Sequence, residues 1–144
     1  MGNRAVITTN ENLKELGVYL HWNGGRDSVE GFLAFCKMKG FRAPEEDDYG
    51  WACLACVCCN FFGDGLSCGI NTCEYLDCNN YDNGVYIIKD WNIVGRKFNS
   101  GEQLEYDLEK MVTGIDELQP KALKLTEAEW DRFEEVKKEI MAHR

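Results

Sequence analysis

A change of hydrophobic pattern within residues 20–40, LHWNGGRDSVEGFLAFCKMKG, most constrains what this chain can fold into. Residues 17–20 are typical of a short strand, and two glycines then lead into apolar residues at helical spacing. Asp27 or Ser28 is expected to cap this helix, and Gly40 is placed to end it. The stretch therefore predicts a strand, a tight corner and an amphipathic helix.

Further strands and a second helix are expected in the first hundred residues. Residues 4–8 are typical of a strand, and acidic residues after Pro44 precede the apolar run WACLACVCCNFFG, which predicts a buried helix ending at Gly63. Three more strands are expected at 66–70, 85–88 and 91–98. Because the connections between these three are short, antiparallel pairing is favoured.

The last third of the chain has a helical pattern. Five apolar residues follow steps of four, three, four and three and lie on one helical seam: Leu104, Leu108, Met111, Ile115 and Leu118. Pro120 ends that helix, and Thr126 with Glu129 forms a capping-box pattern before a second apolar stripe that includes Trp130, Phe133, Val136 and Ile140. We expect a helical hairpin whose seam folds back on the body or meets another subunit, and we favour a dimer.

The expected architecture is thus α+β, a small antiparallel β-sheet body with packed helices and a C-terminal helical hairpin used for oligomerisation. The length of 144 residues suits one domain. Residues 1–100 would form the ligand-binding body, and residues 101–144 the hairpin of the same domain.

The charge balance excludes one class of partner. Lys and Arg total 16 against 25 Asp and Glu, a formal net charge of −9, whereas polymeric nucleic acid favours a basic surface. A small anion needs only one or two placed cations, and the corner Asn23-Gly24-Gly25-Arg26 can add backbone N–H groups and a helix dipole. No Lys or Arg occurs between Ala43 and Ile88, so four residues stand out as anion contacts: Arg26, Lys89, Arg96 and Lys97.

A cytoplasmic location is expected. The beginning MGNRAVITTNEN lacks the basic start and apolar run of a signal peptide, and no stretch is long enough to cross a bilayer. In that compartment the eight cysteines would be reduced thiols or metal ligands rather than disulfides.

Cys53 and Cys56 have the two-residue spacing that lets two thiolates share one zinc ion. A zinc ribbon needs two such pairs on tight loops, however, and this pair lies in an apolar helix while the other cysteines are unevenly spaced. We therefore favour buried structural thiols and expect no metal and no cofactor.

No enzyme is predicted. The only histidines are His21, at the end of an apolar strand, and His143, next to the last residue given. The acidic run at 45–48 is typical of a solvated loop, and no P-loop, dinucleotide fingerprint or nucleophile elbow is present.

A binding constellation remains. It consists of the glycine corner with Asn23, Gly25 and Arg26, of Asp82 and Asn83 beside Tyr81, and of Asn92 preceding Arg96; Trp22, Tyr75, Tyr86 and Phe98 can stack on a base. Each feature alone has a structural explanation, such as a turn or a core aromatic. Together they suit a small phosphorylated ligand that contains a base.

Four stretches resemble one known family when they occur together in this order: GNRAVI, VYLHWNGGRDSVEGFL, YGWACLACVCCNFFG and DNGVYIIKDWNIVGR. The chain resembles the phage Thoeris anti-defence proteins of the first type, the cyclic-nucleotide sponges, over roughly residues 2–96. The resemblance implies a non-enzymatic protein that binds glycocyclic ADP-ribose, the signal of bacterial TIR-domain enzymes, and holds it intact in the cytosol of the infected cell.

The resemblance also implies partners and contacts. Family members build ligand pockets at a dimer interface; some assemble into hexamers as trimers of dimers and also bind cyclic di- or trinucleotides. Arg26 and Arg96 would contact the pyrophosphate, while Asp82, Asn83 and Asn92 would meet ribose or base. Two alternatives stay open, an enzyme that degrades a cyclic nucleotide signal and a cysteine-rich zinc interaction module.

Overall fold

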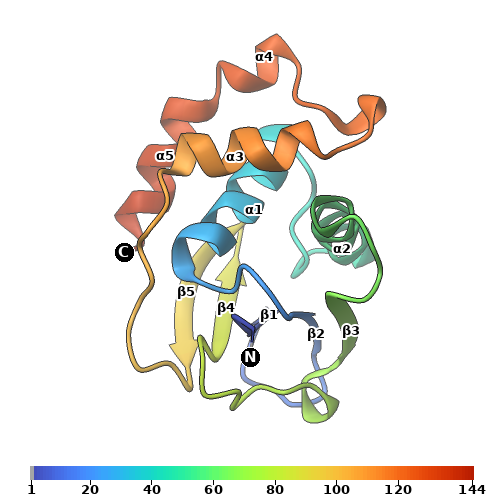
Figure 1. Ribbon diagram of the computed structural model, residues 1–144, viewed down its shortest axis with the longest axis vertical. Helices are drawn as coiled ribbons and strands as arrows, with labels where there is room; N and C mark the ends of the chain where they lie inside the picture. The colour runs from blue at the N-terminus through green and yellow to red at the C-terminus, as the bar shows by residue number, and fades with distance from the viewer. Residues whose placement is uncertain (1) are drawn as a thin grey trace.

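A five-stranded sheet forms the base of the molecule in the computed structural model, which describes residues 2–144 (Figure 1). The strands are β1 (Ala5–Thr8), β2 (Leu16–Leu20), β3 (Cys68–Thr72), β4 (Val85–Lys89) and β5 (Asn92–Lys97), in the spatial order β3-β2-β1-β4-β5. The α+β class is confirmed. Met1, the first residue of the expected 1–100 body, lies outside the described residues.

The sheet is mostly antiparallel, with one exception. β1 pairs antiparallel with β2, β2 with β3, and β4 with β5, but β1 and β4 are parallel. The expected antiparallel pairing of the two strands joined by the tight turn at Asp90-Trp91 is confirmed. The first of the three expected strands, β3, pairs with β2 instead and is not a neighbour of β4. The chain returns from β1 to β4 only after two helices, and such a long connection allows the parallel pairing.

One strand lies two residues later than expected. Residues 66–70 were expected to be extended, whereas β3 runs Cys68–Thr72 and Leu66 is exposed. The carboxylate of Asp64 accepts hydrogen bonds from the backbone N–H groups of Leu66 and Ser67, at 2.9 and 3.2 Å. This Asx turn holds residues 64–67 in a loop before the strand begins.

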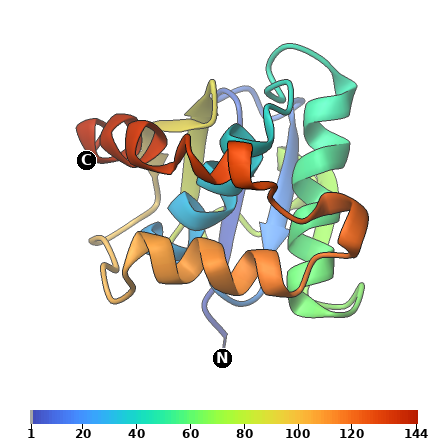
Figure 2. The ribbon, with the colours of Figure 1, turned by 90° about the horizontal axis from the view of Figure 1, so that it is seen from above.

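The glycine corner leads into α1 (Arg26–Lys39), which begins slightly earlier than predicted. Gly25 occupies the N-cap position rather than Asp27 or Ser28, and Gly40 ends the helix in the left-handed conformation, as expected. Nearly all of α1 is buried because it lies over the sheet and is surrounded by the other helices (Figure 2).

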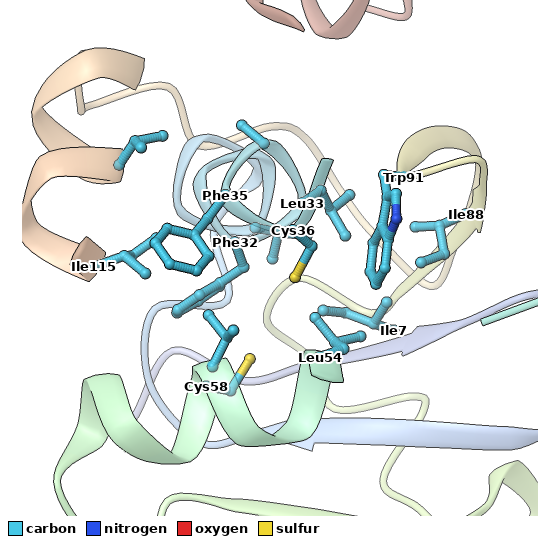
Figure 3. Packing of buried hydrophobic residues seen from close by; sticks show 14 of the residues in the cluster. Ile7, Phe32, Leu33, Phe35, Cys36, Leu54, Cys58, Ile88, Trp91 and Ile115 are labelled. Carbon is cyan, nitrogen blue, oxygen red and sulfur yellow. The ribbon is translucent and has the colours of Figure 1, made fainter. Parts of the chain in front are cut away.

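The cysteine-rich helix α2 (Asp48–Phe62) ends at Gly63, as predicted. The expectation that it is buried all round is wrong. Trp51, Leu54 and Val57 face the core while Cys56 is exposed, because α2 contacts α1 and β3 along one side only. Figure 3 shows Leu54 and Cys58 of α2 facing Phe32 and Cys36 of α1.

The C-terminal third forms three helices, α3 (Leu108–Glu117), α4 (Glu127–Trp130) and α5 (Phe133–Ala142). Leu104 and Leu118 of the expected seam are exposed. The reason is that α3 includes only the middle residues of the seam, and Leu104 and Leu118 lie outside the helix. The Thr126 and Glu129 capping box is present, but the second helix is interrupted at residues 131–132.

The apolar seam of these helices is covered by the chain itself. α3 and α5 make their main helix contacts with α1 rather than with each other, so they form only a loose hairpin. Met111, Val112 and Ile115 of α3 and Val136 and Ile140 of α5 belong to the same core cluster as α1 and the sheet. Residues 101–144 are therefore part of one core with the body.

No helix among residues 2–144 has the length and hydropathy that a membrane span requires.

Candidate functional site

Arg96 of β5 lies over the ring of Tyr86, its cross-strand neighbour on β4. The guanidinium carbon is 3.7 Å from the ring centroid, and the Tyr86 hydroxyl donates a 2.7 Å hydrogen bond to the carbonyl of Gly24. The Arg96 guanidinium also donates to the carbonyls of Val85 and Asn83, at 3.2 and 2.5 Å. Stacking and two carbonyls hold the group in one orientation.

Arg26 occupies the first turn of α1 and is buried. Its Nε donates to Oε2 of Glu30 one helical turn later, at 3.1 Å, and one terminal nitrogen donates to the carbonyl of His143 at 2.8 Å. The Glu30 side chain is only 1% exposed. A carboxylate this deeply buried requires charged partners, and the second one is Arg144, 2.7 Å away.

The two arginines meet at Glu102. Oε2 of Glu102 lies 2.5 Å from Arg26, and Oε1 accepts from Arg96. One carboxylate thus bridges the two guanidinium groups that the sequence analysis assigned to a pyrophosphate. Two adjacent guanidinium groups can bind the oxygens of a phosphoryl group in the same way.

Glu102 belongs to residues 98–107, called here the 98–107 segment, which link β5 to α3 without regular secondary structure. Asp27 holds this segment: its Oδ2 accepts hydrogen bonds from the N–H groups of Glu105 and Tyr106, and its own N–H donates to the carbonyl of Gln103 at 3.2 Å. Figure 1 shows the segment running beside the C-terminal end of α5.

A pocket of about 250 Å³ lies at this place, lined by Arg26, Glu102, Leu104 and Arg144. We call these four residues with Arg96 the arginine site. Burial lowers the pKa of Arg96, whereas the hydrogen bond to Glu30 raises the pKa of Arg144. Arginine remains protonated at neutral pH in either case, so the site offers three permanent positive charges.

Gly24 and Gly25 of the corner have no side chain, which lets other parts of the chain pack closely against them. A Cβ on Gly24 would lie 2.8 Å from the carbonyl carbon of Arg4, and one on Gly25 would lie 2.6 Å from Oε1 of Gln103. The corner that was expected to be open to an anion is therefore filled by the N-terminal residues and the 98–107 segment. Of the corner residues 23–26, only Arg26 lines the pocket.

Asn83 and Asp82 lie next to the arginine site. The carbonyl of Asn83 accepts from Arg96, while its side-chain amide donates to Asn3 at 2.6 Å. Asp82 binds the guanidinium of Arg4 at 2.8 Å instead, and although burial opposes it, this hydrogen bond lowers the pKa of Asp82. Both polar side chains are thus engaged within the chain.

Asn92, Asn23 and Trp22 are not joined to the arginines by any hydrogen bond or ion pair recorded for residues 2–144. Asn92 is the first residue of β5, donates to Glu139 at 2.9 Å, and has a buried Oδ1 without a partner. Asn23 donates weakly to Ser28 at 3.4 Å, and Trp22 lies edge-on to His21. The half-exposed Trp22 ring remains available for stacking.

The cysteines are free thiols. Cys36 and Cys58 are fully buried, and burial raises their pKa well above that of an exposed thiol. Within the described part of the chain, no three His, Cys, Asp or Glu side chains come together as a metal site would require. Cys53 and Cys56 therefore have no further ligand there.

The sequence analysis missed Glu30, Glu102 and Arg144. Glu30 follows Arg26 by four residues, a spacing at which opposite charges on a helix pair, so this partner was within reach of pattern analysis. Glu102 and Arg144 come from distant parts of the chain, and no local pattern marks them.

Comparison of the chain with protein-family models, with curated proteins and with solved structures finds no match.

Proposed function

We propose that this protein binds a small phosphorylated nucleotide of the glycocyclic ADP-ribose class and holds it without cleaving it, as an anti-defence sponge. The observation that carries the proposal is the convergence of Arg26 and Arg96 on the carboxylate of Glu102, which with Arg26 lines a pocket. These are the two residues that the family resemblance assigns to the pyrophosphate.

The electrostatics support a compact anion over a polymer. The net charge of −9 repels polymeric nucleic acid, while the arginine site brings three guanidinium groups together at one point. A sponge works by mass action, so its dissociation constant must lie below the concentration of the signal. Permanently charged guanidinium groups suit tight retention of a diphosphate.

The proposal places the protein in the cytoplasm of the infected bacterial cell, where the signal is made, and includes a homodimer that can assemble further into a hexamer. The C-terminal seam is covered by α1, so a dimer would use another surface. Light scattering of the purified protein tests this part: a monomer at every concentration would contradict it.

The deciding experiment is incubation with glycocyclic ADP-ribose, filtration, and mass analysis of what heating releases. Depletion of the filtrate followed by recovery of intact ligand supports the sponge. Depletion with an altered mass supports the alternative of a degrading enzyme, and no depletion contradicts both. Cyclic di- and trinucleotides in the same assay test for a second class of ligand.

Two variants assign the site. Arg26→Ala and Arg96→Ala are each expected to abolish retention, whereas Arg42→Ala is the matched control because Arg42 contacts Asp47 and Tyr49, away from the arginine site. Full retention by both site variants, with unchanged circular dichroism, would contradict the assignment.

A further inference from the structure

The pocket at the arginine site is too small for the proposed ligand as it stands. Its volume is about 250 Å³, and sites for drug-sized ligands span about 300–1,000 Å³. A phosphoryl group fits this space, whereas two linked nucleosides would extend beyond it. More of the nucleotide can enter only if part of the pocket wall moves.

The 98–107 segment is a part of the pocket wall without regular secondary structure. Leu104 and Tyr106 are 52% and 55% exposed and so provide little apolar anchoring. The contacts that hold it at the site are polar: Asp27 binds the backbone of Gln103, Glu105 and Tyr106, and Glu102 binds the two arginines. Segments with few buried apolar contacts open at low free-energy cost.

Glu102 occupies the position that a ligand anion needs. Its two oxygens bind Arg26 and Arg96 as two oxygens of a phosphoryl group would. Its side chain is 27% exposed, while the side chains of Arg26 and Arg96 are 8% and 11% exposed. Glu102 therefore covers the arginines from the solvent side.

The charge balance of the cluster favours replacement of Glu102 by another anion. Arg26, Arg96 and Arg144 pair with the carboxylates of Glu30 and Glu102. The nearby Asp27 carboxylate, which interacts electrostatically with Arg144, brings the formal charge of the cluster to zero with Glu102 in place. Removal of Glu102 leaves one uncompensated positive charge in a largely buried site. Such a charge is costly without a partner and strongly favours a replacement anion.

We infer that Glu102 is an exchangeable internal ligand of the arginine site: a phosphoryl anion takes its place, and the 98–107 segment moves outward to admit the rest of the nucleotide. The inference rests on the proposed function for the identity of the full ligand, but displacement itself requires only a phosphoryl anion. Inorganic pyrophosphate is therefore the probe.

The first experiment is calorimetric titration of pyrophosphate at fixed ionic strength. Glu102→Gln keeps the shape of the side chain but removes the competing charge, so we expect it to bind pyrophosphate at least about tenfold more tightly than the unmodified protein. Glu105→Gln is the matched control, since it makes the same charge change on an exposed side chain of the same segment. Equal or weaker binding by Glu102→Gln overturns the inference, as does an equal gain in the control.

The second experiment needs no variant. Hydrogen exchange of the Glu105 and Tyr106 amides, which donate to Asp27, is measured with and without saturating pyrophosphate. We expect exchange to accelerate at least about tenfold, because outward movement breaks both hydrogen bonds. Unchanged protection with pyrophosphate bound overturns the displacement.

The two proposals fail separately. Displacement by pyrophosphate without retention of glycocyclic ADP-ribose would leave the exchange of Glu102 standing and contradict the sponge. Retention of glycocyclic ADP-ribose without displacement of Glu102 would leave the sponge standing and contradict the exchange.

Discussion

Arg26 and Arg96 bind the two oxygens of a single carboxylate, although one begins a helix and the other lies near the end of an edge strand. The structure thus places two cations where a diphosphate can be held and fills the position between them with Glu102. Under the proposed function, binding of the ligand and exclusion of competing anions would depend on the same three side chains.

Arg96→Lys is expected to reduce retention of glycocyclic ADP-ribose about tenfold or more, even though it keeps the charge. Lysine has no planar group to lie on Tyr86, and its three donors share one nitrogen, so they do not span Glu102, Val85 and Asn83 as the three guanidinium nitrogens do. The filtration assay measures the loss, with Arg42→Lys as control. Unchanged retention would show that a point charge is sufficient at this position.

Glu30→Ala is expected to lower the free energy of unfolding by about 3 kcal/mol, because it leaves the buried Arg26 guanidinium with fewer partners. Urea denaturation measures the change. The matched variant Glu117→Ala removes an exposed carboxylate in the last turn of α3, and its effect should stay within about 0.5 kcal/mol. Equal losses of unfolding free energy in the two variants would mean that the buried ion pairs of Glu30 contribute nothing to stability.

Gly24→Ala is expected to destabilise the protein by about 1–3 kcal/mol, since its Cβ would collide with the backbone of Asn3 and Arg4. Gly114→Ala is the control, and its effect on stability should have the opposite sign. Gly114 lies within α3 with open space around it, so alanine there should stabilise by about 0.5–1 kcal/mol. Thermal unfolding of both variants checks the signs, and a neutral Gly24→Ala would contradict the close approach.

Trp91→Ala is expected to cost about 3–5 kcal/mol. The Trp91 ring is 1% exposed, and its Nε1 donates to the carbonyl of Phe41 at 2.8 Å. Trp22→Ala, which truncates a half-exposed ring, should cost less than about 1 kcal/mol. Urea denaturation of the pair tests the assignment of Trp91 to the core, and a small loss for Trp91→Ala would contradict it.

Stability should fall as the pH rises above about 9. Burial raises the folded-state pKa of the Cys36 and Cys58 thiols well above the ordinary value of 9.0, and burial with the Cys59 hydrogen bond raises the pKa of Cys68 to about 12. The unfolded chain then loses these protons at lower pH than the folded protein does. Their contribution is complete below pH 9 and is lost as the pH rises toward 12.

Urea midpoints from pH 7 to pH 10.5 test this dependence. Cys36→Ala removes one buried thiol and should show a smaller loss at alkaline pH than the unmodified protein. A midpoint that stays constant over the range would contradict the assignment.

The sequence by itself determined the features that rest on neighbours along the chain. The spacing of apolar residues placed α1 and α2, Gly40 and Gly63 ended them, and the Thr126 and Glu129 capping box was recognisable, because each involves residues within one or two helical turns. The α+β class followed from the succession of these patterns. Arg26 and Arg96 stood out, with Lys89 and Lys97, because no Lys or Arg occurs between Ala43 and Ile88.

Only the tertiary structure decided what lies across long separations. The parallel pairing of β1 with β4, the packing of α3 and α5 on α1, and the burial of their seam depend on which surfaces meet after the chain closes. The arginine site is of the same kind. Glu102 is 76 residues from Arg26, and Arg144 is 114 residues from Glu30. Local sequence patterns extend over a few residues, so they carry no information about contacts between residues this far apart in the chain. These residues come together only when the core packs.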